Sequence, residues 1–412
     1  MRGGVGSRDT VSAFAEQRAD QRAYRLTSVD MLRGLVIVIM AIDHARDFFM
    51  SSATIDPLSD PNVGIGLYFT RWITHFCAPV FVCLAGVSAG LMVARRSPAD
   101  LFRFLLTRGL WLIFIEVFVI STAVTFSPGG IAELGGKTLM FMQVIWAIGS
   151  SMVLLAFAQF LGRRVCLILG AAIVLGHNAL DGVWPAANGL LDTSPPLWAA
   201  LHTPMSKIAG PFHMLFLYPM LPWLGVMLLG FGASGLFERD AAARRSGLLR
   251  WGLAITALFF VLRALDVYGE PNHWEGHERS LATFFDFLNT SKYPPSLLFL
   301  AMTLGPAAVL CAFAESWRGF FKDAFVMFGR VPFAFYVAHF YLLHLMSVLL
   351  GVMQGFPAAK LFTFPIFYPQ GYGVSLPLVY VGWALAIALL YPFCRWVAGV
   401  KARSRAWWLS YV

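Results

Sequence analysis

Long apolar segments recur along the chain and are separated by shorter stretches that carry charged residues, Gly and Pro. A bilayer core about 30 Å thick is crossed by a helix of about 20 apolar residues, so each segment of that length is a candidate span. The fifth segment is short and ends at His177 and Asn178, which leaves open whether it crosses fully. The pattern predicts about ten transmembrane helices, near residues 29–50, 67–94, 101–125, 140–161, 165–180, 211–235, 248–268, 294–314, 324–351 and 375–399.

The basic residues gather at alternate ends of these segments. Cytoplasmic loops of membrane proteins are enriched in Lys and Arg, and most of the 31 basic residues lie on the side that holds both termini. We therefore expect an all-α polytopic membrane protein with both termini cytoplasmic. Its parts would be a basic N-terminal tail over 1–28, a transmembrane domain over 29–399 and a cytoplasmic C-terminal tail over 400–412.

Composition supports the same class of protein. The 412 residues are 58% hydrophobic and only 13% charged, whereas soluble domains are about half apolar and a quarter charged. A soluble fold and intrinsic disorder are therefore excluded. Because the topology explains the net charge of +9, we expect membrane lipid and no nucleic acid as partner. With no apolar signal segment at the start, the predicted location is a bacterial inner membrane.

The densest polar cluster ends the first predicted span, at Asp43, His44, Arg46 and Asp47. Residues three or four apart share a helix face, so His44 can meet Asp47, and Asp43 can meet Arg46. A histidine oriented by a carboxylate is a common general base, which makes His44, Asp43 and Asp47 candidate catalytic residues. Arg46 is a candidate substrate contact. The alternative is that these residues only mark the membrane interface.

A second pair opens the next span, where Arg71 and His75 are four residues apart. An Arg beside a His can bind an anionic group or stabilise an oxyanion, so Arg71 is a candidate substrate contact and His75 a candidate catalytic residue. The alternative is an interfacial anchor beside a histidine with a structural role. Both interpretations remain open at this point.

Further polar residues lie in or beside other spans. Glu116 is in the middle of the third span, where we expect it to pair with a histidine or a backbone group. It is also a candidate substrate contact, with Lys292, Tyr293, Tyr336 and His339. The five cysteines show no disulfide or metal pattern, and no metal is expected.

Two motifs are set aside. Gly86-Val-Ser-Ala-Gly90 has the G-x-S-x-G form of serine hydrolases but lies inside an apolar span, where small residues typically pack helices together. His273 and His277 have metal-like spacing but lie in a Gly- and Pro-containing loop without an evident third ligand. Neither motif predicts chemistry.

Several segments resemble one family. They are Arg25-Leu-Thr-Ser-Val-Asp-Met-Leu-Arg-Gly34 followed by Asp43-His44, Trp72 to Gly86, Phe287-Leu-Asn-Thr-Ser-Lys-Tyr-Pro-Pro-Ser296, and Gly329-Arg-Val-Pro-Phe333 with Tyr336 and His339. In this order they resemble the heparan-alpha-glucosaminide N-acetyltransferase catalytic-domain family, in a bacterial branch of the transmembrane acyltransferases.

The resemblance implies acyl transfer from acetyl-CoA or another acyl-CoA on the cytoplasmic side. The acceptor would be a sugar or glycan on the outer side, with a histidine as general base. The lysosomal animal enzymes carry Asn where His44 stands and place their catalytic histidine before the second span. His44 instead resembles the first-span histidine of the wider sugar acyltransferases.

Three questions stay open in the sequence: the acceptor, direct transfer against an acyl-histidine intermediate, and a homodimer as a further partner. The alternative function is a transporter or glycolipid flippase with a polar outer cavity. Such a protein typically has ionisable groups through both halves of the membrane and inverted repeats. This chain has neither feature, which favours the enzyme.

Overall fold

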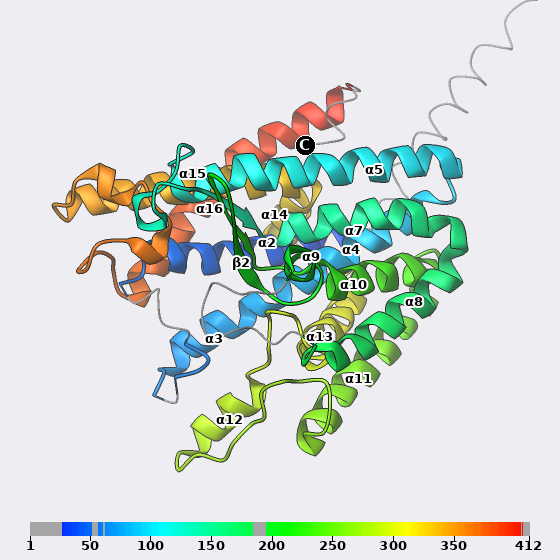
Figure 1. Ribbon diagram of the computed structural model, residues 1–412. Coiled ribbons are helices and arrows are strands. Elements are labelled where there is room, and N and C mark those ends of the chain that lie inside the picture. Colours follow the sequence, from blue (N-terminus) through cyan, green and yellow to red (C-terminus); the bar gives the residue numbers. More distant parts are fainter. Residues whose placement is uncertain (1–26, 52–56, 61, 184–194, 405, 407–412) are drawn as a thin grey trace, which may run out of the picture.

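The computed structural model describes residues 27–51, 57–60, 62–183, 195–404 and 406, and helices dominate this part of the chain (Figure 1). Most of the predicted tail over 1–28 and the last residues of the predicted tail over 400–412 lie outside the described residues. The helices are α2 (Thr27–Phe49), α3 (Ile65–Ile73), α4 (Cys77–Met92), α5 (Pro98–Phe114), α6 (Ser121–Thr125), α7 (Val144–Ala158), α8 (Gly162–Gly176), α9 (Pro196–Leu201), α10 (Met220–Ala233), α11 (Ala241–Leu265), α12 (Ser280–Leu288), α13 (Leu297–Ala314), α14 (Phe320–Arg330), α15 (Pro332–Met353) and α16 (Leu376–Arg403). The strands are β1 (Thr138–Met142), β2 (Met205–Ala209) and β3 (Phe212–Phe216).

Helix α2 is packed against α4, α13, α14, α15 and α16, so the first predicted span lies inside the bundle. Its contact with α14 is backbone to backbone. A Cβ added to Gly34 would lie 1.8 Å from the carbonyl oxygen of Phe325, and one on Gly329 would lie 1.8 Å from that of Asp30. Only glycine permits this approach, which brings the first turns of α2 against α14.

Helices α4 and α10 pack equally closely, through glycines on both sides. A Cβ on Gly86 would lie 2.1 Å from the carbonyl oxygen of Met227, and one on Gly230 would lie 2.2 Å from that of Cys83. Gly90 meets Ser234 in the same way. The interpretation of the G-x-S-x-G sequence as a helix-packing motif is therefore confirmed.

Seven helical segments within the described residues are long and apolar enough to cross a membrane, which makes this an integral membrane protein. They are Ile65–Met92, Pro98–Thr125, Val144–Leu180, Ala241–Leu265, Leu297–Ala314, Pro332–Met353 and Leu376–Arg403. Val144–Leu180 contains two helices, α7 and α8, joined by the 3₁₀ turn Gln159–Leu161. Helix α2 is not among the seven, since charged residues occupy both of its ends.

A small sheet corrects the prediction of an all-α protein. Its strand order is β1-β3-β2, with β1 parallel to β3 and β2 antiparallel to β3. Strand β1 lies partly in the predicted span 140–161, and β3 lies in the predicted span 211–235. Both were predicted as helix because a strand of five mostly apolar residues, followed directly by an apolar helix, extends the same hydrophobic run.

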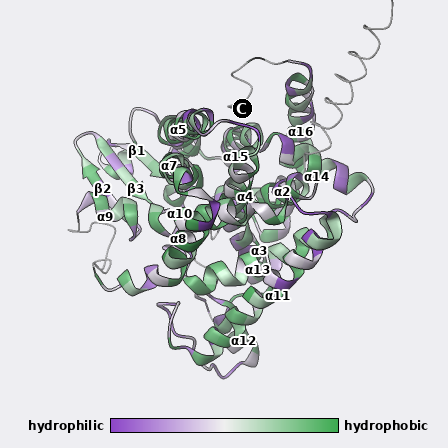
Figure 2. Cartoon of the chain, turned by 90° about the vertical axis from the view of Figure 1, so that its right-hand side faces the viewer, coloured by the Kyte–Doolittle hydropathy of each residue, from purple (hydrophilic) through white to green (hydrophobic). Residues whose placement is uncertain are grey.

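The outer surface of the bundle is apolar, as expected in lipid. Figure 2 shows hydrophobic residues over the outward surfaces of the helices as well as between them. On the peripheral helices α11 and α16, Trp251 is 68% exposed and Trp396 is 63% exposed. Side chains of this kind covering a helical bundle indicate a surface that faces a bilayer, since a soluble monomer rarely exposes large apolar patches.

Candidate active site

Asp43 near the end of α2 is the centre of a cluster of charges. Arg71 of α3 donates a hydrogen bond of 2.5 Å to its Oδ2, and Arg46 lies 3.2 Å from its Oδ1. The ammonium of Lys292 lies 4.0 Å from Oδ2, and Arg46 also pairs with Asp47 at 2.8 Å. Three cations thus surround two carboxylates, and the cluster can attract an anionic group.

This cluster lines a cavity of about 260 Å³. Seven of the predicted site residues meet there: Asp43, His44, Arg46, Asp47, Arg71, Lys292 and Tyr293. They come from α2, from α3 and from the loop before α13, which are far apart in the sequence. Aromatic side chains, including Phe81, Phe141 and Phe340, supply much of the remaining wall. A mostly apolar cavity with a few converging polar groups is typical of a small-molecule site.

His44 faces the cavity with an aromatic support behind it. Its ring lies 4.4 Å from that of Phe340 and 5.2 Å from that of His339, measured between centroids. Among the described residues His44 has no hydrogen bond to Asp43 or Asp47, whose carboxylates pair with Arg46 and Arg71. The imidazole is held by ring packing instead, so its nitrogens are available to a substrate.

His339 supports His44 from α15 and does not line the cavity. Its Nδ1 donates to the carbonyl oxygen of Tyr336 at 2.5 Å. Within the described residues its Nε2 is buried without a hydrogen-bond partner. His339 was predicted as a substrate contact, and the structure places it beside His44 and outside the lining of this cavity. Tyr336 lines a different cavity, described below.

The structure does not bring His75 to the cavity. The chain passes through a 3₁₀ turn over Thr74–Phe76, and the His75 Nδ1 donates to the carbonyl oxygen of Arg71 at 2.9 Å. The ring is 2% exposed and packs against Phe299. Four-residue spacing predicted a shared face with Arg71, but the altered helical turn and this hydrogen bond direct the ring into the core.

Glu116 also lies away from this cavity. It lies in the π-helical turn Ile115–Ile120, and its Oε1 accepts a hydrogen bond of 2.9 Å from the backbone N–H of Gln143. This confirms the expected pairing with a backbone group. Glu116 does not line the cavity, so its prediction as a substrate contact is not supported by its position. It anchors the junction between β1 and α7 that forms one cavity wall.

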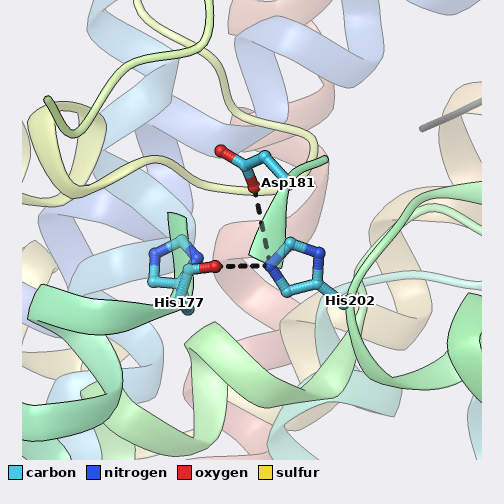
Figure 3. A group of neighbouring side chains, drawn as sticks. All are labelled: His177, Asp181 and His202. Carbon is cyan, nitrogen blue, oxygen red and sulfur yellow. Dashed lines mark hydrogen bonds and ion pairs between the residues drawn. The ribbon is translucent and has the colours of Figure 1, made fainter. Parts of the chain in front are cut away.

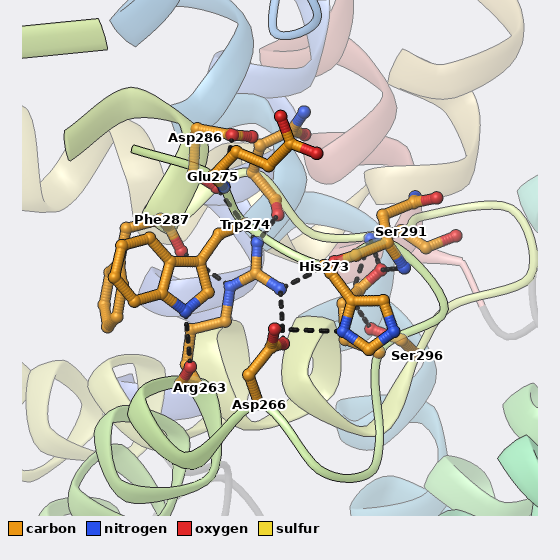
Figure 4. A network of polar contacts seen from close by, with 12 residues as sticks. Arg263, Asp266, His273, Trp274, Glu275, Asp286, Phe287, Ser291 and Ser296 are labelled. Atoms are coloured by element: carbon orange, nitrogen blue, oxygen red, sulfur yellow. Dashed lines mark hydrogen bonds and ion pairs between the residues drawn. The ribbon is translucent and has the colours of Figure 1, made fainter. Parts of the chain in front are cut away.

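A buried arginine, Arg263, organises the loop that precedes Lys292 and Tyr293 in the sequence (Figure 4). Arg263 of α11 is 1% exposed, and its guanidinium donates to four backbone carbonyls of the segment 272–289. The acceptors are Asn272, Asp286, Phe287 and Asn289, at 2.8 to 3.0 Å. One planar side chain with five donors therefore organises the loop that leads into the site.

Glu270 fixes the next part of the same loop. It accepts hydrogen bonds from the backbone N–H of Asn272 and of Ser291 and a bond of 2.6 Å from the hydroxyl of Ser296. Burial raises the pKa of Glu270, and these hydrogen bonds oppose that shift. Lys292 lies between Ser291 and Ser296, so both of its flanks are anchored.

Tyr293 and Tyr218 form an aromatic pair in the cavity wall. Their ring centroids are 5.4 Å apart in an edge-to-face arrangement, and the ammonium of Lys292 lies 5.2 Å from the Tyr293 centroid. Burial alone would raise the pKa of Tyr293, but the positive charges of Lys292 and Arg71 outweigh it and lower the pKa. Tyr218 and Gln143 were not predicted as site residues, because both lie in apolar runs assigned to spans.

A second cavity of about 340 Å³ lies on the other side of the same wall. Phe81 and Val144 line both cavities, so the two share this part of their walls. The second cavity is basic, with Arg33, Arg108, Arg330 and Lys401 in its lining. Arg33 also donates a hydrogen bond of 2.9 Å to Ser88 Oγ, which places the serine of the G-x-S-x-G sequence at this cavity.

The fold and the two cavities just described belong to an integral membrane protein that encloses a buried group of charges. Residues 25–268 match the family model described as heparan-alpha-glucosaminide N-acetyltransferase, catalytic. The match covers more than half of the chain, and the chain belongs to this family. No curated protein matches it in a sequence comparison. Membership implies a membrane acetyltransferase, in agreement with the resemblance seen in the sequence.

Proposed function

We propose that the protein transfers an acetyl or other acyl group from cytoplasmic acyl-CoA to a sugar or glycan acceptor on the outer side. The observation that carries the proposal is the pair of cavities that meet at Phe81 and Val144. One is lined by basic residues from the predicted cytoplasmic ends of the helices. The other holds His44 among charged and aromatic side chains.

The basic cavity suits the donor. Coenzyme A carries phosphates at one end and the thioester at the end of a long flexible arm. Arg33, Arg108, Arg330 and Lys401 would bind the phosphates, since charge-assisted hydrogen bonds to phosphate are among the stronger polar contacts. The arm would then pass between Phe81 and Val144 and deliver the thioester to His44.

His44 would act as general base. A ring nitrogen removes the proton from the acceptor hydroxyl or amine as its oxygen or nitrogen attacks the thioester carbonyl carbon. Arg71 or Lys292 stabilises the negative charge that develops on the carbonyl oxygen. The C–S bond then breaks, and the CoA thiolate takes the proton from His44. In the alternative route His44 itself is acylated first, which would give ping-pong kinetics.

Asp43 would act through the cations around it. Its carboxylate pairs with Arg71 and Arg46 and lies near Lys292, so it holds these charges beside His44. Asp47 would have the same effect on Arg46. This assigns the two aspartates a positioning function, in place of the direct orientation of His44 expected from helix spacing.

The proposed membrane arrangement has ten crossings with both termini cytoplasmic, in a bacterial inner membrane. Support comes from separate helices α7 and α8 inside one apolar segment, from α2 packed inside the bundle and from the apolar helix α10. Helices α7 and α8 have 15 residues each, or about 22 Å, so each would cross a locally thinned core.

A transporter or flippase remains the second candidate, because two cavities separated by a constriction also resemble an alternating-access path. Release of free CoA from acetyl-CoA distinguishes the two functions. The measurement uses purified protein in nanodiscs with a panel of amino-sugar and glycan acceptors. An enzyme releases CoA in step with acceptor acetylation, whereas a transporter releases none.

The matched variants for this assay are His44→Ala and His273→Ala. General-base catalysis typically contributes about 10²–10⁴-fold, so His44→Ala should lose at least about 100-fold in turnover. His273 is 71% exposed and distant from the cavity lining, so its variant should retain wild-type turnover. Near-full activity of folded His44→Ala would reject His44 as the base.

A further inference from the structure

Three side chains outside the proposed active site converge at the end of α8 (Figure 3). His177 follows α8, Asp181 follows one turn later, and His202 comes directly after α9. One ligand atom from each residue lies within 4.8 Å of the other two. His177 is 2% exposed and His202 is fully buried. Two imidazoles and a carboxylate thus lie close together in a largely buried position.

The polar atoms of this group are poorly satisfied by the protein. Among the described residues, both ring nitrogens of His177, Nδ1 of His202 and Oδ1 of Asp181 are buried without a hydrogen-bond partner. Nε2 of His202 donates to the carbonyl oxygen of His177 at 2.9 Å and lies 3.5 Å from Asp181 Oδ1. Buried polar atoms normally have a hydrogen-bond partner. Four buried atoms in one cluster with no such partner among the described residues therefore indicate a missing ligand.

The carboxylate is already oriented by an outer contact. Asn178 Nδ2 donates to Asp181 Oδ2 at 2.8 Å, and Asn178 Oδ1 accepts from the backbone N–H of Leu297 at 2.9 Å. With Oδ2 engaged, Oδ1 is left for the two imidazoles. Hydrogen-bonded outer residues that orient a ligating carboxylate are a regular feature of metal sites.

We propose that His177, Asp181 and His202 bind a divalent transition metal ion of the zinc type. Imidazole nitrogen and carboxylate oxygen are ligands that Zn²⁺ prefers, at about 2.0–2.2 Å. Binding requires the side chains to close in from their present spacing, and His202 exchanges its bond to the His177 carbonyl for the ion. The fourth position of a tetrahedral ion would hold water.

The ion would act as a clamp. It would join the end of α8 to the segment that enters β2, while Asn178 links the same point to the start of α13. Strand β2 pairs with β3, which leads directly to Tyr218 in the cavity wall. Metal binding at this point would affect stability and metal content, and it does not depend on acyl transfer.

Metal content tests the proposal directly. Protein purified through a tag without histidines is exposed to Zn²⁺, dialysed and measured by mass spectrometry for metal per chain. We expect about one Zn²⁺ per wild-type chain and less than a tenth of that in Asp181→Asn and His202→Ala. Asp181→Asn keeps the size of the side chain, so it guards against a loss of metal through unfolding.

The matched control is the double variant His273→Ala/His277→Ala. These histidines pair separately with Asp266 and Asp286 at 2.9 and 3.0 Å, so they do not converge on one point. The control should keep its metal. Substitution with Co²⁺ should give visible absorption bands in the wild type and in the control, but not in Asp181→Asn. A wild-type chain without stoichiometric metal, or one matched by Asp181→Asn, overturns the proposal.

Discussion

Arg71 of α3 donates a hydrogen bond of 2.5 Å to Asp43 of α2, and this contact joins residues 28 positions apart in the sequence. Asp43 also pairs with Arg46 and lies near Lys292, so a single carboxylate holds three cations at the cavity. These cations come from two helices and a loop. The cluster of charges around Asp43 therefore forms only when the tertiary structure brings these segments together.

Replacing Asp43 by Asn should therefore be strongly destabilising. Removing one partner of a buried ion pair leaves its cations uncompensated, which typically costs about 3–5 kcal/mol of unfolding free energy. Asp47→Asn is the matched control, because the Asp47 side chain is 41% exposed and its loss should cost less than about 1 kcal/mol. Thermal unfolding in nanodiscs measures both, and equal shifts would contradict the assigned geometry.

The close approach of α2 and α14 predicts a second stability effect. Gly34→Ala would place a Cβ 1.8 Å from the Phe325 carbonyl oxygen, so the helices must separate, at a cost of about 3 kcal/mol or more. Gly66→Ala in α3 is the control, since its nearest neighbour would be Leu376 Cδ2 at 3.7 Å. It should be neutral or slightly stabilising. A tolerated Gly34→Ala would show that α2 and α14 are not in backbone contact.

Arg108 provides a test of donor binding. It lines the basic cavity, and loss of a charge-assisted contact to a CoA phosphate should raise KM for acetyl-CoA by about 10–100-fold. The maximal rate should change little. Arg103→Ala on the same helix removes an exposed arginine outside the cavity lining and should leave KM unchanged. If both variants behave alike, the basic cavity is not the donor site.

Glu270 makes a prediction about pH. Burial raises its pKa in the folded protein above the ordinary value of 4.5. Because the pKa of Glu270 is higher in the folded protein than in the unfolded chain, protonation of Glu270 stabilises the fold. This stabilisation is complete below pH 4.5 and is lost as the pH rises through the folded-state pKa. The melting temperature of the wild type minus that of Glu270→Gln should therefore increase as the pH falls from 7 towards 4.5. A difference that is constant, or that changes in the other direction, contradicts the assignment.

Much of the helical framework could be predicted from hydrophobic runs alone. Segments such as Pro98–Thr125 and Leu297–Ala314 lie close to their predicted bounds, because about 20 apolar residues in lipid have few alternatives to a helix. The strands β1 and β3 could not be separated in this way. Each is a short apolar run before an apolar helix, and only their pairing with one another reveals them.

The site was predicted in part. Asp43, His44 and Arg46 could be found because ionisable residues are rare in an apolar helix, and helix spacing correctly paired Asp43 with Arg46. The same rule failed for Arg71 and His75, where the 3₁₀ turn Thr74–Phe76 changes the direction of the side chains. No local pattern marks Tyr218, which reaches the cavity only through the sheet.

The clusters outside the cavity show why spacing alone is insufficient. His273 and His277 have metal-like spacing, yet each pairs with its own aspartate. His177 and His202 are 25 positions apart and meet only in three dimensions. Arg263 carries no sequence signal either, since its four carbonyl acceptors belong to a loop whose path the sequence does not predict.

A sided assay in proteoliposomes tests whether the protein transfers the acetyl group across the membrane. Radiolabelled acetyl-CoA is supplied to vesicles in which the proposed cytoplasmic face is outward, and an amino-sugar acceptor is enclosed within. We expect acetylated acceptor inside the vesicles and free CoA outside, both abolished in His44→Ala and retained in His273→Ala. Intact acetyl-CoA or untransformed acceptor crossing the membrane, without acetylation, would contradict this expectation.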